Sequence, residues 1–289
     1  MRLSEVRELV QATATRWSED NVPRLAAAFS FYAVLSLAPL LVFAVVLGGY
    51  FLGQSDTQTQ ILTQVQQAVG KGGRDLVEEL IKQANKPGAS VIASLLSLIV
   101  TFFSASNLFL QLNDSVNAIW GIKTQGPFLK NLLLTRIGAF LGVLFFGVIV
   151  LGWVGLDSWL HWLDQRVPGI PGWKALSVIV SIVFLAIVFA VAFRSLPKDK
   201  VSWKDTIVPA IVTALGISLA KYALSLYFGL AKVSEAYGSA GALVVILLWI
   251  YYTSQIFFFG IEMTYVNSHQ RGSHQGEPVR TEPIPTLGA

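Results

Sequence analysis

Polar side chains recur along residues 90–114, inside the otherwise apolar stretch SVIASLLSLIVTFFSASNLFLQLND. Ser90, Ser94, Ser97, Thr101 and Ser104 follow one another at spacings of four, three, four and three, and Gln111 and Asp114 come after them. At 100° per residue, the five hydroxyls fall within an arc of about 80° on one helix face. Such hydroxyls either form a packing seam, bonded to carbonyls of their own helix, or line a polar path. In both cases we expect this face to point away from lipid.

Three more polar residues occur within or at the end of long apolar segments. Lys221 lies well inside one of them, where a cation costs roughly 3 kcal/mol, so it either faces the bundle interior or snorkels to the outer interface. Gln255 lies near the middle of the last segment, and Glu262 ends it, either paired with Arg136 or at the interface. The residues expected along a polar pathway are therefore Ser94, Ser97, Thr101, Ser104, Gln111, Asp114, Lys221, Gln255 and Glu262.

Residues able to carry out catalysis are scarce. The chain has no cysteine and three histidines, of which His269 and His274 fall in a polar C-terminal stretch where we expect them to be solvated. Neither a zinc-protease, a serine-hydrolase nor a phosphate-loop motif occurs, and no carboxylate cluster suits two metal ions. We therefore expect no catalytic residues, no metal and no cofactor, and we predict that the protein is not an enzyme.

Composition explains what must position these side chains. Of the 289 residues, 54% are hydrophobic and only 13% are charged, with a mean hydropathy of +0.60. Soluble domains carry about 25% charged residues, so a membrane protein is indicated. Spans need roughly 20 apolar residues and must be helical to satisfy their backbone. The sequence thus predicts an all-α, polytopic membrane bundle with six transmembrane helices, in Leu25–Leu52, Ala89–Leu112, Ile137–Leu156, Ala175–Phe193, Thr206–Ala231 and Ala236–Ile261.

The distribution of Lys and Arg predicts the orientation of these spans. Cations gather before the first span and after the fourth, at Arg2, Arg7, Arg16, Arg24, Arg194, Lys198, Lys200 and Lys204. The loops after the third and fifth spans carry only Arg166, Lys174 and Lys232. Positive residues prefer the cytoplasmic side, so both termini should be cytoplasmic, although the long first loop mixes both signs of charge. The net charge of +4 then reflects cytoplasmic loops and not a nucleic-acid site.

Three segments outside the spans have a character of their own. Residues 1–24 include a short amphipathic helix with Leu3, Val6, Val10, Ala14 and Trp17 on one face, which either lies on the membrane surface or packs under the bundle. Residues 57–86 predict an extracytoplasmic hairpin of two helices, broken at Gly70, Gly72 and Gly73, that caps the bundle. Residues 267–289 are polar and proline-rich, which favours a disordered tail after a membrane domain of residues 25–266.

Small residues and one proline are the structural features expected inside the spans. Glycines or alanines four residues apart let helix backbones approach closely, either within the bundle or at a dimer interface. These pairs are Gly49 with Gly53, Gly138 with Gly142, and Gly238 with Ala242. Pro39 lies in the middle of the first span, where it removes a backbone hydrogen bond and predicts a kink.

Four stretches of the chain resemble a known family. RLAAAFSFYAVLSLAPLL, LNDSVNAIWGI, LPKDKVSW and YGSAGALVVILLWIYYTSQIFFFGIE are similar to the YihY/BrkB family of bacterial inner-membrane proteins, and the likeness runs from Arg16 to Val266. The resemblance implies about six helices and the bacterial inner membrane. Because the molecular function of the family is not settled, it implies no catalytic or ligand set. The chain departs from the pattern at Ile261, where a smaller residue is more usual.

Three functions remain in view at this point. The first is a transporter or channel-like protein for a small solute, an ion or a lipid, whose identity these residues do not specify. The second is a non-transporting envelope scaffold, in which the polar groups only specify packing. The third is the ribonuclease that an old label of the family implies, which the residues do not support. The expected partners are the lipid bilayer and the solute or lipid, without nucleic acid, and the glycine pairs are compatible with an oligomer.

Overall fold

The fold comes from a computed structural model that describes residues 3–52, 54–69, 71–84, 91–122, 173–231 and 241–276, with short pieces between 136 and 159. Every regular element in these residues is a helix, as the sequence predicted. The helices are α1 (Leu3–Glu19), α2 (Val22–Leu52), α3 (Gln54–Val69), α4 (Lys71–Ala84), α5 (Val91–Ile119), α7 (Trp173–Ser195), α8 (Trp203–Ala231) and α10 (Gly241–Arg271).

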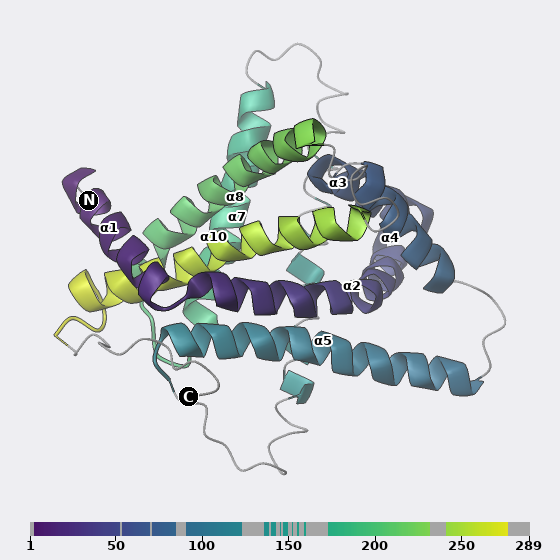
Figure 1. Ribbon diagram of the computed structural model, residues 1–289, viewed down its shortest axis with the longest axis horizontal. Coiled ribbons are helices and arrows are strands. Elements are labelled where there is room, and N and C mark those ends of the chain that lie inside the picture. The colour runs from purple at the N-terminus through teal and green to yellow at the C-terminus, as the bar shows by residue number, and fades with distance from the viewer. Residues whose placement is uncertain are drawn as a thin grey trace.

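Helix α10 is the central element of the bundle. It packs against α8 on one side and α2 on another, while α5 packs on α2 and α7 on α8 (Figure 1). Large apolar side chains remain exposed on the outer faces of α7 and α8, among them Ile179, Ile187, Leu219 and Leu226. Exposed apolar surface of this extent is what lipid contact requires.

Three described helical segments are long and apolar enough to cross a membrane, namely Leu176–Ser195, Trp203–Leu224 and Leu243–Arg271. They correspond to the fourth, fifth and sixth predicted spans. Helices α2 and α5 contain 31 and 29 residues, and the third predicted span is described only in pieces. The count of six spans therefore stays a prediction.

Helix ends that are far apart in sequence meet at one end of the bundle, which we call the α1 end. The starts of α2 and α8 and the ends of α5, α7 and α10 all contribute to one buried cluster there, together with Leu9 of α1. The eight consecutive residues from Ile261 to Ser268 are each at most 6% exposed, so the final turns of α10 are covered on every side. This segment mostly follows the apolar run that ends at Ile261, and it extends into the stretch expected as a tail.

Local backbone signals set the junctions at the α1 end. Asn21 adopts a left-handed conformation (φ 51°) between α1 and α2, which Asn tolerates better than most residues. Gly121 (φ 71°) ends α5, and the amide of Ile122 donates to the carbonyl of Asn117 at 2.9 Å. This pairing is typical of a glycine-terminated helix, and it ends α5 at Ile119.

The segment predicted as a hairpin forms α3 and α4, which pack on each other. Gly72 and Gly73 lie inside α4, so the helices are separated only around residue 70. Val77 and Ile81 of α4 are buried against Leu37 of α2. The hairpin therefore lies along the far half of α2 and also contacts α10 and α8.

Candidate functional site

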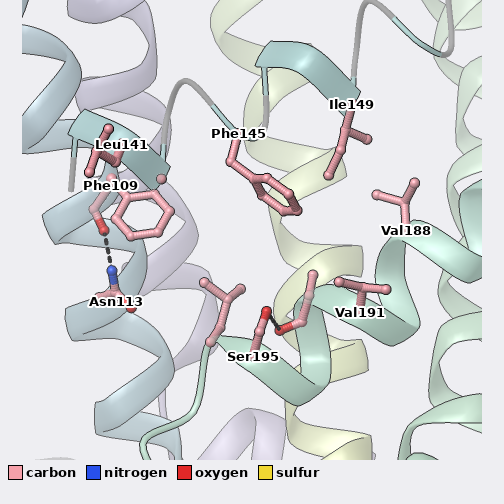
Figure 2. Close-up of a pocket in the computed structure, with 11 residues that line it drawn as sticks. Phe109, Asn113, Leu141, Phe145, Ile149, Val188, Val191 and Ser195 are labelled. Atoms are coloured by element: carbon pink, nitrogen blue, oxygen red, sulfur yellow. Dashed lines mark hydrogen bonds between the residues drawn. The ribbon is translucent and has the colours of Figure 1, made fainter. Parts of the chain in front are cut away.

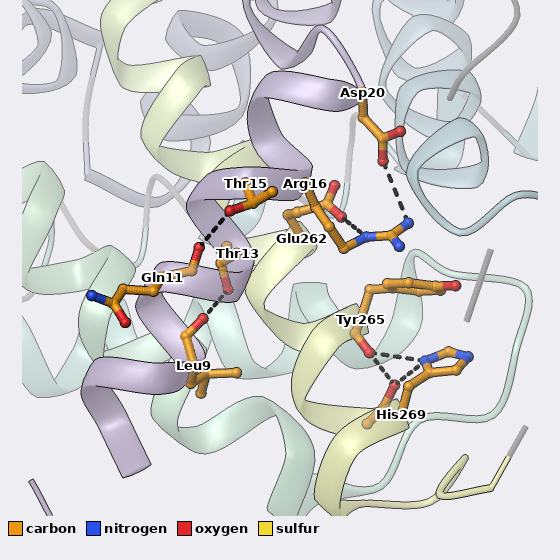
Figure 3. A network of polar contacts seen from close by, with 10 residues as sticks. Leu9, Gln11, Thr13, Thr15, Arg16, Asp20, Glu262, Tyr265 and His269 are labelled. Atoms are coloured by element: carbon orange, nitrogen blue, oxygen red, sulfur yellow. Dashed lines mark hydrogen bonds and ion pairs between the residues drawn. The ribbon is translucent and has the colours of Figure 1, made fainter. Parts of the chain in front are cut away.

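A buried ion pair joins α1 to α10 at the α1 end. Arg16 Nε donates to Glu262 Oε1 at 2.8 Å, and the two side chains are 13% and 0% exposed. A second carboxylate, Asp20, lies 3.6 Å from Arg16 Nη2, and the guanidinium carbon lies 4.5 Å from the Tyr265 ring centroid. Buried charges persist only when they are paired and hydrogen-bonded, so this network fixes how α1 sits on α10 (Figure 3).

The partner of Glu262 differs from the pairing considered from the sequence. Arg136 instead donates to Asn107 Oδ1 at 3.1 Å, and its guanidinium carbon lies 4.8 Å from the Phe103 ring centroid. Arg136 therefore ties the start of the third apolar segment to α5. The sequence analysis did not identify Arg16 as a site residue. Its position four residues before Asp20, which suits an ion pair on one helix face, was the signal that could have indicated it.

Helix α1 packs under the bundle, and Trp17 of the predicted apolar face packs against the buried cluster, but other residues of that face point outward. Leu9 and Thr13 are 1% and 0% exposed, whereas Val10 is 36% exposed. Ala14 is also exposed. The face that turns inward carries Arg16 and Asp20, because the surface it meets contains the Glu262 carboxylate.

A column of stacked rings continues from the ion pair. The Tyr265 and His269 ring centroids are 4.1 Å apart, and those of His269 and His274 are 5.3 Å apart with planes 19° from parallel. Trp120 meets Tyr265 edge-on at 5.3 Å. Both histidines are partly exposed, but they do not lie in a disordered segment as expected, because α10 extends to Arg271 and its last turns pack against the end of α5.

The turn after α10 is held by Asp205 at the start of α8. Ser273 donates to Asp205 Oδ2 through its amide at 3.0 Å and through its hydroxyl at 2.7 Å. Asn267 Nδ2 donates to the carbonyl of Asp205 at 3.0 Å. These bonds keep residues 272–276 packed over the α1 end.

The polar stripe of α5 is described only in its second half. The side chains of Ser94, Ser97 and Thr101 lie outside the described residues. Further along, the Ser36 hydroxyl of α2 donates to the carbonyl of Ser104 at 2.8 Å. Gln111 Nε2 donates to Ser115 Oγ at 3.2 Å, and Asp114 is exposed. At Ser104, then, the striped helix contacts α2 directly.

The glycine pairs behave unequally. The Phe109 ring packs directly on Gly142, so an added Cβ would collide with it, whereas a Cβ at Gly138 would meet nothing within 4 Å. The packing of Pro39, Gly49, Gly53 and Gly238 lies outside the described residues. Gly260 was not singled out from the sequence. The Phe193 ring and the Thr213 hydroxyl pack so closely on it that an added Cβ would collide with both.

One of the predicted pathway residues, Gln255, lines a groove between α8 and α10. The groove has a volume of about 510 Å³ and is lined by Trp17, Val212, Thr213, Gly216, Ala220, Ala223, Leu224, Tyr252, Gln255, Ile256 and Phe259. Lys221 does not line the groove. It lies three residues before the lining residue Leu224, so the two are neighbours on the surface of α8, and it is partly exposed. Glu262 and the stripe do not line this groove, so the structure does not join the nine candidates into one path.

The groove is apolar apart from a few hydrogen-bonding groups. Thr213 is 1% exposed, and its hydroxyl has no hydrogen-bond partner. Gln255 adds an amide to the same wall. The described residues contain no cluster of three or more His, Asp or Glu side chains suited to a metal ion. The arrangement is suited to holding an apolar chain with a few polar contacts.

Comparison with known proteins identifies the relatives of this chain. The family model described as virulence factor BrkB matches residues 13–284. UPF0761 membrane proteins of Ralstonia nicotianae and of Neisseria meningitidis serogroup C are 26% and 24% identical, over 86% and 89% of this chain and 56% and 62% of their own lengths. The chain thus spans little more than half the length of these relatives. No solved structure matches it. The resemblance seen in the four stretches is confirmed, and the chain belongs to the BrkB family of membrane proteins.

Proposed function

We propose that this protein moves a lipid or another anionic amphiphile within the bacterial inner membrane. The groove between α8 and α10 takes the apolar chain, and Lys221 meets the anionic headgroup. The observation that carries this proposal is the groove itself, with its volume of about 510 Å³ and its almost wholly apolar lining. Lys221 lies next to these lining residues on α8, and a cation within a membrane span is functional by default.

The lining favours an amphiphile over a hydrated ion or a sugar-like solute. Polar groups taken from water into an apolar site cost several kcal/mol unless new hydrogen bonds replace the lost ones. Here Thr213 and Gln255 are joined by few other polar side chains along the groove. An acyl chain needs no such partners, and the exposed apolar side chains beside the groove, such as Leu219 and Leu226, allow entry from the bilayer.

The proposal also states which end of the bundle faces the cytoplasm. The α1 end carries the cation-rich segments before α2 and between α7 and α8, so it would face the cytoplasm, with both termini on that side. The far end of the groove, near Lys221, would then face the outer leaflet.

Reconstitution tests the proposal. Purified protein is inserted into liposomes that contain a trace of fluorescent phosphatidylglycerol, and dithionite reports how fast the probe changes leaflet. We expect faster exchange than in protein-free liposomes, and a return to the protein-free rate in Ala220→Leu, which fills the groove. Ile187→Trp adds bulk to α7 at a side chain that is 59% exposed and does not line the groove, and it should retain the wild-type rate.

The scaffold alternative rests on a different observation, the tightly packed polar network at the α1 end. It gains support if wild-type liposomes exchange the probe no faster than empty ones. A ribonuclease is the last candidate, because the residues provide no acid–base pair. Purified protein should not cleave RNA, and cleavage lost through a point substitution in this chain would reverse that ranking.

A further inference from the structure

A second cavity opens beside α7. It has a volume of about 410 Å³ and lies between α5, the helical pieces after Arg136, and α7 (Figure 2). Phe109, Phe145, Ile149, Val188 and Val191 form its apolar wall. Phe145 is 56% exposed, so the cavity opens sideways toward lipid. It shares no lining residue with the groove between α8 and α10.

One end of this cavity is polar. Asn113 of α5 and Ser195, the last residue of α7, line it there. Asn113 uses its amide group to donate to the carbonyl of Phe109 at 3.1 Å. Ser195 donates to the carbonyl of Ala192 at 3.5 Å. The cavity thus has an apolar body and a polar mouth at the α1 end.

An acidic and a basic residue follow two of the lining residues closely in the sequence. Asp114 follows Asn113 on α5, and Lys198 comes two residues after Leu196, which also lines the cavity. Both residues are exposed. Partial burial of its carboxyl group raises the pKa of Asp114, and the nearby Lys198 charge opposes that rise. A headgroup that carries both signs of charge would offer each of these two side chains an opposite charge.

We propose that this cavity binds phosphatidylethanolamine from the surrounding bilayer. One acyl chain occupies the apolar body, the phosphate lies against Lys198, and the ammonium lies against Asp114. Opposite charges on one headgroup match opposite charges on the protein, whereas a phosphatidylglycerol headgroup offers Asp114 only an uncharged glycerol. The volume falls in the range of about 300–1,000 Å³ that is usual for ligand cavities. This site does not depend on transport through the other groove.

Lipid binding to the purified, delipidated full chain tests the site. Native mass spectrometry with equal amounts of phosphatidylethanolamine and phosphatidylglycerol should show the ethanolamine lipid bound at least about tenfold more tightly, equal to about 1.4 kcal/mol. Asp114→Asn should abolish that preference, because Asp114 is the group that distinguishes the ammonium of one headgroup from the uncharged glycerol of the other. The exchanged pair Asp114→Lys with Lys198→Asp should restore it, because the two charges only change places. Equal binding of both lipids by the wild type would overturn the proposal.

Variants of the cavity wall test where the chain lies. Val191→Phe fills the cavity and should weaken phosphatidylethanolamine binding at least about tenfold. Val183→Phe is the matched control on α7, at a side chain that is 52% exposed and outside the cavity, and it should bind as the wild type does. Monodisperse elution of each variant shows that it is folded. Unchanged binding by folded Val191→Phe, or full competition by chain-free glycerophosphoethanolamine, contradicts occupation of the cavity by an acyl chain.

Discussion

Arg16 and Glu262 lie 246 residues apart in sequence and are joined by a hydrogen-bonded ion pair of 2.8 Å at the α1 end. The pair connects α1 to α10, the first and the last of the helices that the structure describes. Because Glu262 has no exposed surface, its charge depends on this neighbourhood for solvation. The pair therefore makes the position of α1 a condition of the fold.

Breaking the pair should destabilise the protein strongly. Arg16→Met leaves a buried carboxylate, and the loss should be about 3–5 kcal/mol, as for other buried pairs broken on one side. The double variant Arg16→Met with Glu262→Gln should be more stable than Arg16→Met alone, since no buried charge is stranded. Thermal unfolding in detergent measures both, with Arg7→Met as the exposed control on α1. Equal stability of Arg16→Met and Arg7→Met would show that the pair contributes little.

Gly260 should be far less tolerant of a methyl group than Gly138. An added Cβ at Gly260 meets the Phe193 ring and the Thr213 hydroxyl, whereas one at Gly138 meets nothing. Overpacking of this kind costs about 1–3 kcal/mol, while alanine favours a helix over glycine by up to about 1 kcal/mol. The unfolding temperature of Gly260→Ala should therefore fall below that of the wild type, whereas that of Gly138→Ala should stay level or rise.

Asp205 should keep the turn after α10 closed. Asp205→Ala removes the acceptor of both Ser273 bonds and should expose residues near Arg271 to trypsin. The mass of the released C-terminal fragment identifies the cleavage site. Asp199→Ala removes an exposed carboxylate six residues away and should leave the digestion rate unchanged. If the two variants are digested at the same rate, the turn is held by other contacts.

Lys221 should matter for transport and not for folding. Lys221→Met removes a cation that costs roughly 3 kcal/mol within a span, so yield and unfolding temperature should stay level or rise while lipid exchange falls. Lys221→Arg keeps the charge and should retain most of the exchange. Full exchange by Lys221→Met would mean that this side chain only snorkels to the interface.

Reporter fusions test the proposed sidedness. A fusion after Asp164 should report the outside, and a fusion after Gly276 should report the cytoplasm. The second site follows the turn held by Asp205, so it leaves the buried end of α10 intact. A cytoplasmic signal after Asp164, or an external one after Gly276, contradicts the charge-based orientation.

The sequence by itself determined the class of this protein. Apolar runs too long for a soluble core require helices in a membrane, because only helices satisfy their own backbone there. The all-helical fold and the family both follow from residues that can be read along the chain, such as the LNDSVNAIWGI stretch, whose Gly121 terminates α5. These properties are local, and they do not depend on which helix packs against which.

Only the tertiary structure decided how the polar residues are used. Periodicity placed Val10 and Ala14 of α1 inward, but Leu9, Thr13 and Arg16 face the bundle because Glu262 lies opposite them. His269 and His274 looked solvated until α10 brought them against Trp120. A buried charge or ring takes its partner from whichever helix packs beside it, and that neighbour can be 246 residues away. A sequence pattern indicates which residues share one face of a helix. It does not indicate which part of the chain packs against that face.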